Sequence, residues 1–240
     1  MKERPNSIIE KIKTTQGAPK VIKNFLDKNE IQDFLELYKK LPTTLHNKKQ
    51  NVIKKRWLLN YEKKLEKLFV ERLKNEIGDF KMDNLKTDEG ADIYGLFQES
   101  YSPLKLHADS GFDAETLIYK QTLIPLSSFG ETIIFKNRHH GLSTNFTLDQ
   151  EELNREIKKG QNIRSAEHIK SNWYGNQPFD KTMFDKYLKH EDINNLRGLE
   201  IELVYEWNLG DILIFDRSHL HASSSNIKGK KIGLTTFTKK

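Results

Sequence analysis

The stretch GDILIFDRSHLH (residues 210–221) decides the fold, together with HAD (residues 107–109) much earlier in the chain. In the earlier stretch His107 and Asp109 are two residues apart, so on a strand both side chains point to the same side. In the later stretch a Gly-Asp pair precedes four apolar residues, 212–215, then a polar turn and two histidines. This order is typical of a buried strand that delivers a histidine to the mouth of a β-barrel.

Joining the two stretches predicts a metal site. A histidine from the later stretch, His219 or His221, would add a second imidazole to His107 and Asp109. Two imidazoles and one carboxylate on one face of a metal are the ligand set of non-haem Fe(II) oxygenases. His-x-Asp alone is weak evidence, because it occurs by chance in many exposed loops. The chain contains no cysteine, which leaves histidines and carboxylates as candidate ligands.

The hydrophobic periodicity predicts helices first and strands later. Apolar stripes at helical spacing indicate a helix that begins at Glu30 and ends before Pro42, and a second one over about 51–77, after a polar, irregular lead-in at 1–20. From residue 91 the period changes to two. We expect strands at Ala91–Glu99, Lys105–Asp109, Thr116–Leu126, Glu131–Lys136, Leu199–Trp207, Asp211–Phe215 and Lys231–Thr238.

These elements predict a mainly β protein with N-terminal helices, a jelly roll in one domain over 1–240. Residues 1–90 would form helical support, and 91–136 with 199–240 the β core. Residues 137–198 interrupt the strand pattern, which favours a lid-like insertion with short helices after Asp149 and from Asp180 to Leu188. Trp173 and Tyr174 in this insertion are candidates for lining a substrate pocket.

Composition narrows the classes of protein. The net charge of +6 comes from 40 basic and 34 acidic residues that are mixed along the chain, without the aromatic-rich basic motif of many nucleic-acid binders. The apolar runs are too short to span a membrane, and the first residues lack the apolar core of a signal peptide. With no cysteine, this pattern fits a cytoplasmic protein.

The quoted motifs resemble the 2-oxoglutarate- and Fe(II)-dependent dioxygenase superfamily, in particular its phytanoyl-CoA hydroxylase-like and prolyl 4-hydroxylase-like branches. The resemblance covers roughly 90–136 and 199–240, and it implies a double-stranded β-helix (jelly roll) fold. It also implies that His107, Asp109 and His221 bind Fe(II). His221 is favoured over His219 because the small polar run 222–226 follows it, as in the phytanoyl-type pattern.

The resemblance also suggests how 2-oxoglutarate is held. A basic residue about ten positions after the last histidine pairs with the distal carboxylate in this superfamily, and Lys231 is at that position. The position is more often Arg, whose bidentate fork Lys lacks. Thr132, in a Gly-Glu-Thr turn, and Gln121 would face the same pocket. The alternatives are that Lys231 continues a basic turn and that the other two merely line the barrel.

The function that the resemblance implies is oxidation of an unactivated C–H bond of a small molecule. Fe(II) would be the bound cofactor, and 2-oxoglutarate and O2 would be consumed as co-substrates. The usual outcome is hydroxylation with release of succinate and CO2. Two alternatives remain at this point. One is a jelly roll that binds a ligand without turnover, and the other is an oxygenase that acts on nucleic acid through the basic N-terminal helices.

Overall fold

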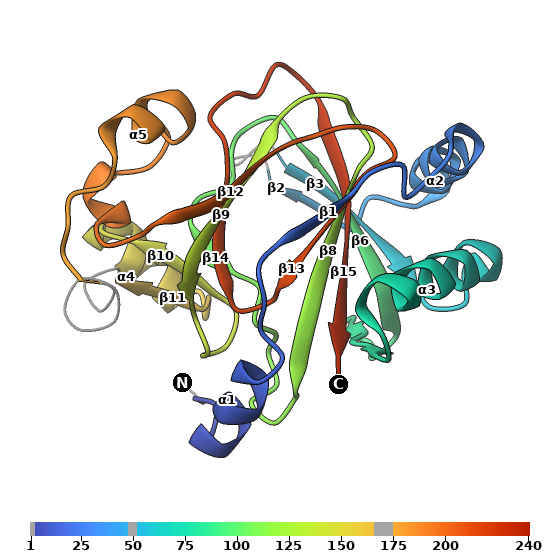
Figure 1. Ribbon diagram of the computed structural model, residues 1–240, viewed down its shortest axis with the longest axis horizontal. Helices are drawn as coiled ribbons and strands as arrows, with labels where there is room; N and C mark the ends of the chain where they lie inside the picture. Colours follow the sequence, from blue (N-terminus) through green and yellow to red (C-terminus); the bar gives the residue numbers. More distant parts are fainter. Residues whose placement is uncertain (1–2, 48–51, 166–174) are drawn as a thin grey trace.

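Two facing β-sheets form the centre of the computed structural model (Figure 1), which describes residues 3–47, 52–165 and 175–240. The larger sheet has the order β1-β13-β8-β15-β6-β3-β2, with β4 beside β15 and β5 beside β6. Its strands are β1 (Lys20–Ile22), β2 (Leu45–Asn47), β3 (Val52–Leu58), β4 (Lys81–Met82), β5 (Leu85–Lys86), β6 (Asp92–Ser100), β8 (Ile118–Pro125), β13 (Ile212–Asp216) and β15 (Lys231–Lys239).

The smaller sheet has the order β11-β10-β7-β14-β9-β12. Its strands are β7 (His107–Ala108), β9 (Glu131–Arg138), β10 (Thr144–Thr147), β11 (Ile163–Ser165), β12 (Ile201–Glu206) and β14 (His219–Ser223). Within the described residues, the helical elements are α1 (Asn6–Lys13), α2 (Lys28–Lys40), α3 (Lys63–Ile77), α4 (Gln150–Lys158), α5 (Lys181–Tyr187) and the 3-10 helix η2 (Ile193–Leu196). The mainly β jelly-roll architecture expected from the sequence is confirmed.

Apolar side chains are buried in three layers. Helices α2 and α3 cover the outer face of the larger sheet, where Phe34 and Phe69 pack around Trp57 and Phe97. The segment 179–199 covers the outer face of the smaller sheet in the same way. Between the two sheets lies a small cluster made of Ile134, Tyr205, Trp207, Leu213 and Phe215. Side chains on the inner faces of both sheets therefore share one interior, and the candidate site lies there.

Two sequence-based expectations about the N-terminal part are wrong. Residues 52–58 form strand β3, not the first turns of a helix that continues to 77. Trp57 and Tyr61 are four residues apart, as on one face of a helix, but they do not share a face. Trp57 is buried on the strand, whereas Tyr61 is 52% exposed in the following turn. Asn60 in that turn has a φ of 67°, which no helix accommodates. The polar lead-in is also not wholly irregular, since it contains α1.

A β-bulge divides the alternating strand predicted at 199–207. The register of β12 against β9 shifts between Ile201 and Leu203, so that Glu202 is an extra residue. Ile201 consequently packs in the outer layer, whereas Leu203 lies with the inner cluster. The sequence alternation is continuous through this point, but the side chains change faces.

The insertion at 137–198 contributes to the sheet as well as to its cover. Strands β10 and β11 extend the smaller sheet beyond β7, and α5 packs on its outer face. Trp173 and Tyr174, the candidate pocket residues, lie outside the described residues. The lid function of this segment remains a prediction. Among the helices that the structure describes, none combines the length and apolar character needed to cross a bilayer.

Candidate active site

His107 and His221 are neighbours on the inner face of the smaller sheet. They are paired residues on the adjacent strands β7 and β14, and their ring centroids are 4.1 Å apart. Asp109 follows β7 by one residue, and its Oδ2 lies 3.4 Å from His221 Nε2 and 3.8 Å from His107 Nε2. One ligand atom from each of the three residues falls within 4.8 Å of the others. The structure therefore brings together the three residues that the sequence singled out.

The backbone fixes which nitrogen of each imidazole faces the site. His107 Nδ1 is 2.6 Å from the carbonyl oxygen of Lys105, and His221 Nδ1 is 3.1 Å from that of His219. A carbonyl oxygen only accepts, so each Nδ1 must carry the proton and donate it. In the neutral imidazole each Nε2 then has a lone pair available to a metal ion held between the two rings and Asp109. This is the arrangement by which proteins orient histidines for a metal ion.

Electrostatics favour the protonation states that bind a cation. Burial, and then the nearby His221, lower the pKa of His107 to about 4. Burial opposes ionisation of Asp109, but the nearby His221 and His107 rings and the hydrogen bond from Gln121 outweigh it and leave the carboxyl pKa below its usual range. Neutral imidazoles and an ionised carboxylate are what a metal ion requires. The donor set fits a divalent cation that takes nitrogen and oxygen ligands.

Gln121 connects the larger sheet to this cluster. It lies on β8, and its Nε2 donates a 2.9 Å hydrogen bond to Asp109 Oδ2. The side chain is buried, and its Oε1 has no hydrogen-bond partner. The amide therefore holds one carboxylate oxygen of Asp109 and leaves a buried acceptor inside the site. The sequence had placed Gln121 in the pocket, but as a residue facing a co-substrate.

Arg217 supports the backbone at Asp109, where the turn after β7 begins. This role was not predicted from the sequence. Its Nε donates to the backbone oxygen of Asp109 at 3.2 Å, and its Nη1 donates to the carboxylate of Asp83. The guanidinium carbon lies 4.9 Å from the ring centroid of Phe237. Arg217 is 1% exposed. A charged residue between the buried strand and the histidines was the available signal for such a role.

The turn after Asp109 is also held from the N-terminal segment. Arg4 donates to the backbone oxygens of Ser110, Gly141 and, at 3.3 Å, Asp113. Gly111 in this turn has a φ of 77°, and a Cβ there would lie 2.9 Å from Arg217 Nη2. The close approach of Arg217 therefore requires glycine at position 111.

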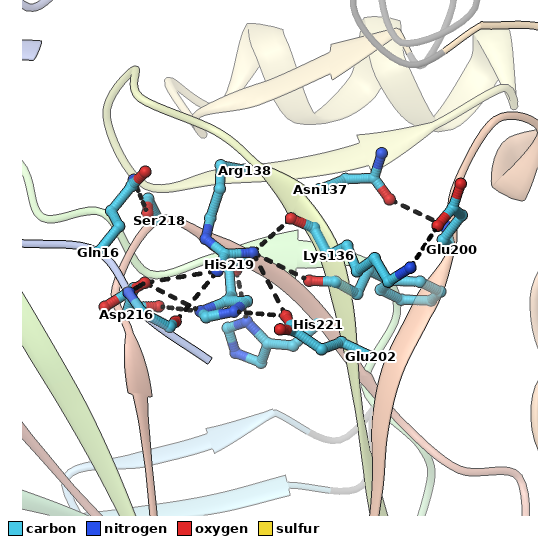
Figure 2. A network of polar contacts seen from close by, with 12 residues as sticks. Gln16, Lys136, Asn137, Arg138, Glu200, Glu202, Asp216, Ser218, His219 and His221 are labelled. Atoms are coloured by element: carbon cyan, nitrogen blue, oxygen red, sulfur yellow. Dashed lines mark hydrogen bonds and ion pairs between the residues drawn. The ribbon is translucent and has the colours of Figure 1, made fainter. Parts of the chain in front are cut away.

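His219, the competing candidate, takes part in a different network (Figure 2). Its Nδ1 is 3.1 Å from the backbone oxygen of Asp216, and its Nε2 is 3.1 Å from Glu202 Oε2. Arg138 lies 3.6 Å from the same Glu202 oxygen and 3.5 Å from Asp216 Oδ2. The bulge in β12 supplies Glu202 to this network. His219 is buried there, with neither nitrogen directed at Asp109.

Lys231 and Thr132 both contact the side chain of Trp207. The Lys231 ammonium lies 4.0 Å from the Trp207 ring centroid and donates to the backbone oxygen of Glu131 at 3.2 Å. Trp207 Nε1 donates in turn to Thr132 Oγ1 at 2.9 Å. Burial lowers the pKa of Lys231 to about 7. Since Trp207 belongs to the inner cluster, both residues line the interior between the sheets.

Comparisons with known proteins identify the fold. No protein-family model and no curated protein matches the sequence. Solved structures do match it. An oxidoreductase of the 2OG-Fe(II) oxygenase family from Burkholderia pseudomallei is 8% identical, with a TM-score of 0.50 over 97% of this chain and 89% of that one. The epimerase SnoN, solved with Fe3+, alpha ketoglutarate and nogalamycin RO, is 9% identical, with a TM-score of 0.51 over 98% and 84%.

The two matches cover nearly the whole chain, helices and insertion included. The chain therefore has the fold of the 2-oxoglutarate- and Fe(II)-dependent oxygenases, the double-stranded β-helix that the motifs predicted. At these identities the likeness concerns the fold, and the site has to be judged from its own geometry.

Proposed function

We propose that this protein is an Fe(II)- and 2-oxoglutarate-dependent oxygenase. The observation that supports the proposal most directly is the convergence of His107 Nε2, His221 Nε2 and the Asp109 carboxylate, with both Nδ1 atoms held by backbone carbonyls. Two imidazoles and one carboxylate with an open opposite face are the ligand set that suits Fe(II) in oxygenases. The fold shared with SnoN, which was solved with Fe3+ and alpha ketoglutarate, adds support.

Each residue of the cluster has a distinct part in this proposal. His107, Asp109 and His221 would hold Fe(II), and Gln121 would keep Asp109 Oδ2 oriented through its hydrogen bond. Lys231 would pair with the distal carboxylate of 2-oxoglutarate, while Thr132 holds the indole against which that ammonium rests. Bound together, Fe(II) and 2-oxoglutarate supply the activation of O2, with succinate and CO2 as the co-substrate's products.

Access to the site is from one side. The His221 side chain is 6% exposed, whereas the side chains of His107 and Asp109 are 16% and 33% exposed. A substrate would therefore approach across His107 and Asp109, and Phe215 would keep water from the His221 side, where its ring lies 5.1 Å from that imidazole. Exclusion of water there would protect reactive species formed in the site.

We further infer that the substrate is a small molecule and that the reaction is hydroxylation of a C–H bond. Binding of nogalamycin RO in the related fold of SnoN supports the first part. SnoN is named an epimerase, so the same fold also carries other oxidative outcomes. The products formed from a substrate, once one is found, decide between these outcomes.

The test is an anaerobic titration of the metal-free protein with Fe(II) and 2-oxoglutarate, followed by visible absorption. Chelation of the keto acid to iron gives a metal-to-ligand charge-transfer band, which we expect in the wild type and not in His221→Ala. His46→Ala, which removes an exposed histidine of β2, is the matched control and should retain the band. A folded protein that binds iron but gives no band would contradict the proposal and favour a ligand-binding jelly roll without turnover.

A further inference from the structure

The inner face of β3 carries a cation toward the candidate active site. Lys54 pairs with Gln98 on β6, and Gln98 pairs with Gly233 on β15. Lys231 is two residues from Gly233 and therefore shares its face. Since Lys231 contacts Trp207 and Glu131 of the facing side, this is the inner face of the larger sheet.

The opposite parity of β3 confirms this orientation. Trp57 packs in the outer layer among the helices, and Lys55 has its ammonium 4.3 Å from the centroid of the Tyr38 ring on α2. Lys54 has the opposite parity to these two residues and must point inward.

Lys54 has no acidic partner within the described residues. Lys55, on the opposite face of β3, differs in this respect, because it donates to the Tyr38 backbone oxygen at 2.8 Å. No ion pair joins the half-buried Lys54 to a carboxylate in the part of the chain that the structure describes. The sequence from Pro42 to Arg56 contains no Asp or Glu at all. A half-buried ammonium that is not paired with a carboxylate is available to bind a carboxylate or phosphate of a ligand.

Lys54 is not needed to balance the charges of the proposed complex. The two charges of Fe(II) and the one of Lys231 are balanced by the Asp109 carboxylate and the two carboxylates of 2-oxoglutarate. Lys54 and Arg56, which share the inner face of β3, are additional cations there. A negatively charged group of a substrate would neutralise Lys54.

We propose that Lys54 binds an anionic group of the substrate, a carboxylate or a phosphate, and so orients the substrate toward the metal. This inference rests on the proposed function, because it takes the His107, Asp109 and His221 cluster as the place of reaction. It assigns Lys54 to substrate selection and not to the co-substrate, which Lys231 would hold.

The test uses small anions as probes. The protein is loaded with Mn(II) and 2-oxoglutarate, and NMR relaxation is measured for acetate, for methyl phosphate and for acetamide as the neutral control. We expect the paramagnetic ion to relax acetate or methyl phosphate more strongly than acetamide, and the comparison of the two anions distinguishes a carboxylate site from a phosphate site. Lys54→Gln should weaken anion binding at least tenfold, whereas Lys54→Arg should retain it.

Lys55→Gln is the matched control, because it removes the neighbouring ammonium on the opposite face of the same strand. It should leave anion binding unchanged. Equal relaxation of acetamide and both anions, or unchanged anion binding in Lys54→Gln, would overturn the proposal. Saturation-transfer NMR on the same three probes gives the same decision if Mn(II) is not retained.

The charge-transfer titration separates this inference from the proposed function. In Lys54→Gln the Fe(II) and 2-oxoglutarate band should form at the same co-substrate concentration as in the wild type. A large shift would show that Lys54 holds 2-oxoglutarate, which contradicts the assignment to substrate. Absence of the band in the wild type, with anion binding that still depends on Lys54, would contradict the oxygenase and leave an anion-binding site.

Discussion

Gln121 on the larger sheet donates a 2.9 Å hydrogen bond to Oδ2 of Asp109, which follows a strand of the smaller sheet. The bond joins the two sheets at the candidate metal site. It holds Oδ2, the carboxylate oxygen that also faces the two histidines, in a fixed position. The orientation of this carboxylate therefore depends on a residue that does not itself bind the metal.

Replacement of Gln121 by Leu should weaken Fe(II) binding about 10- to 100-fold, the range typical for loss of a partner that orients a metal ligand. Anaerobic titration of the metal-free protein measures this change. Gln161→Leu, at an exposed position in the loop after α4, is the control and should bind Fe(II) as the wild type does. Unchanged affinity in Gln121→Leu would show that the hydrogen bond does not orient Asp109.

Replacement of Arg217 by Met should destabilise the fold by about 3 kcal/mol, because it breaks the buried ion pair with Asp83, which keeps only the more exposed Lys239, and removes the hydrogen bond to the Asp109 backbone oxygen. Urea unfolding of the metal-free protein measures the loss. The double variant Arg217→Met/Asp83→Asn should recover part of it, since the carboxylate that lost its buried partner is then neutral as well. A loss below about 1 kcal/mol in Arg217→Met would mean that the pair contributes little to stability.

The convergence of His107, Asp109 and His221 could be predicted from the sequence because part of their geometry is local. The two-residue spacing of His107 and Asp109 fixes their common direction, and the apolar run before His221 marks a buried strand. Which of His219 and His221 joins them depends on the register shift of β14 between these two residues. Parity on a regular strand cannot reveal such a shift.

The contacts that hold the site were beyond the reach of sequence patterns. Arg217 and Asp83 are 134 residues apart, and Arg4 reaches Ser110 across 106 residues. Neither pair has a spacing that a helix or strand would impose. Tertiary packing also explains why the sequence predicted a helix at β3. Trp57 has helical spacing to the apolar residues that follow it, but its contacts in the outer layer are made from a strand.

The turn after Asp109 should tolerate glycine only. Gly111→Ala would place a Cβ 2.9 Å from Arg217 Nη2 at a φ of 77°. We expect a loss of about 2–3 kcal/mol, from backbone strain and from displacement of Arg217. Gly160→Ala has a similar φ of 72° but open space around the new Cβ, so thermal or urea unfolding should show only the backbone contribution, about 1 kcal/mol. Equal losses in the two variants would mean that the Arg217 side chain moves away from the new Cβ without any loss of folding free energy.

Binding of 2-oxoglutarate should weaken as the pH rises above 7, if Lys231 holds its distal carboxylate. Burial lowers the Lys231 pKa to about 7, so the free protein loses this ammonium charge above that pH. A carboxylate partner favours the charged form, so binding takes up a proton and the affinity falls about tenfold per pH unit until the pKa of the complex is reached. Charge-transfer titrations from pH 6.5 to 9 measure this slope. Lys231→Arg keeps its charge throughout and should flatten the profile, whereas equal slopes in the two proteins would place the anchor elsewhere.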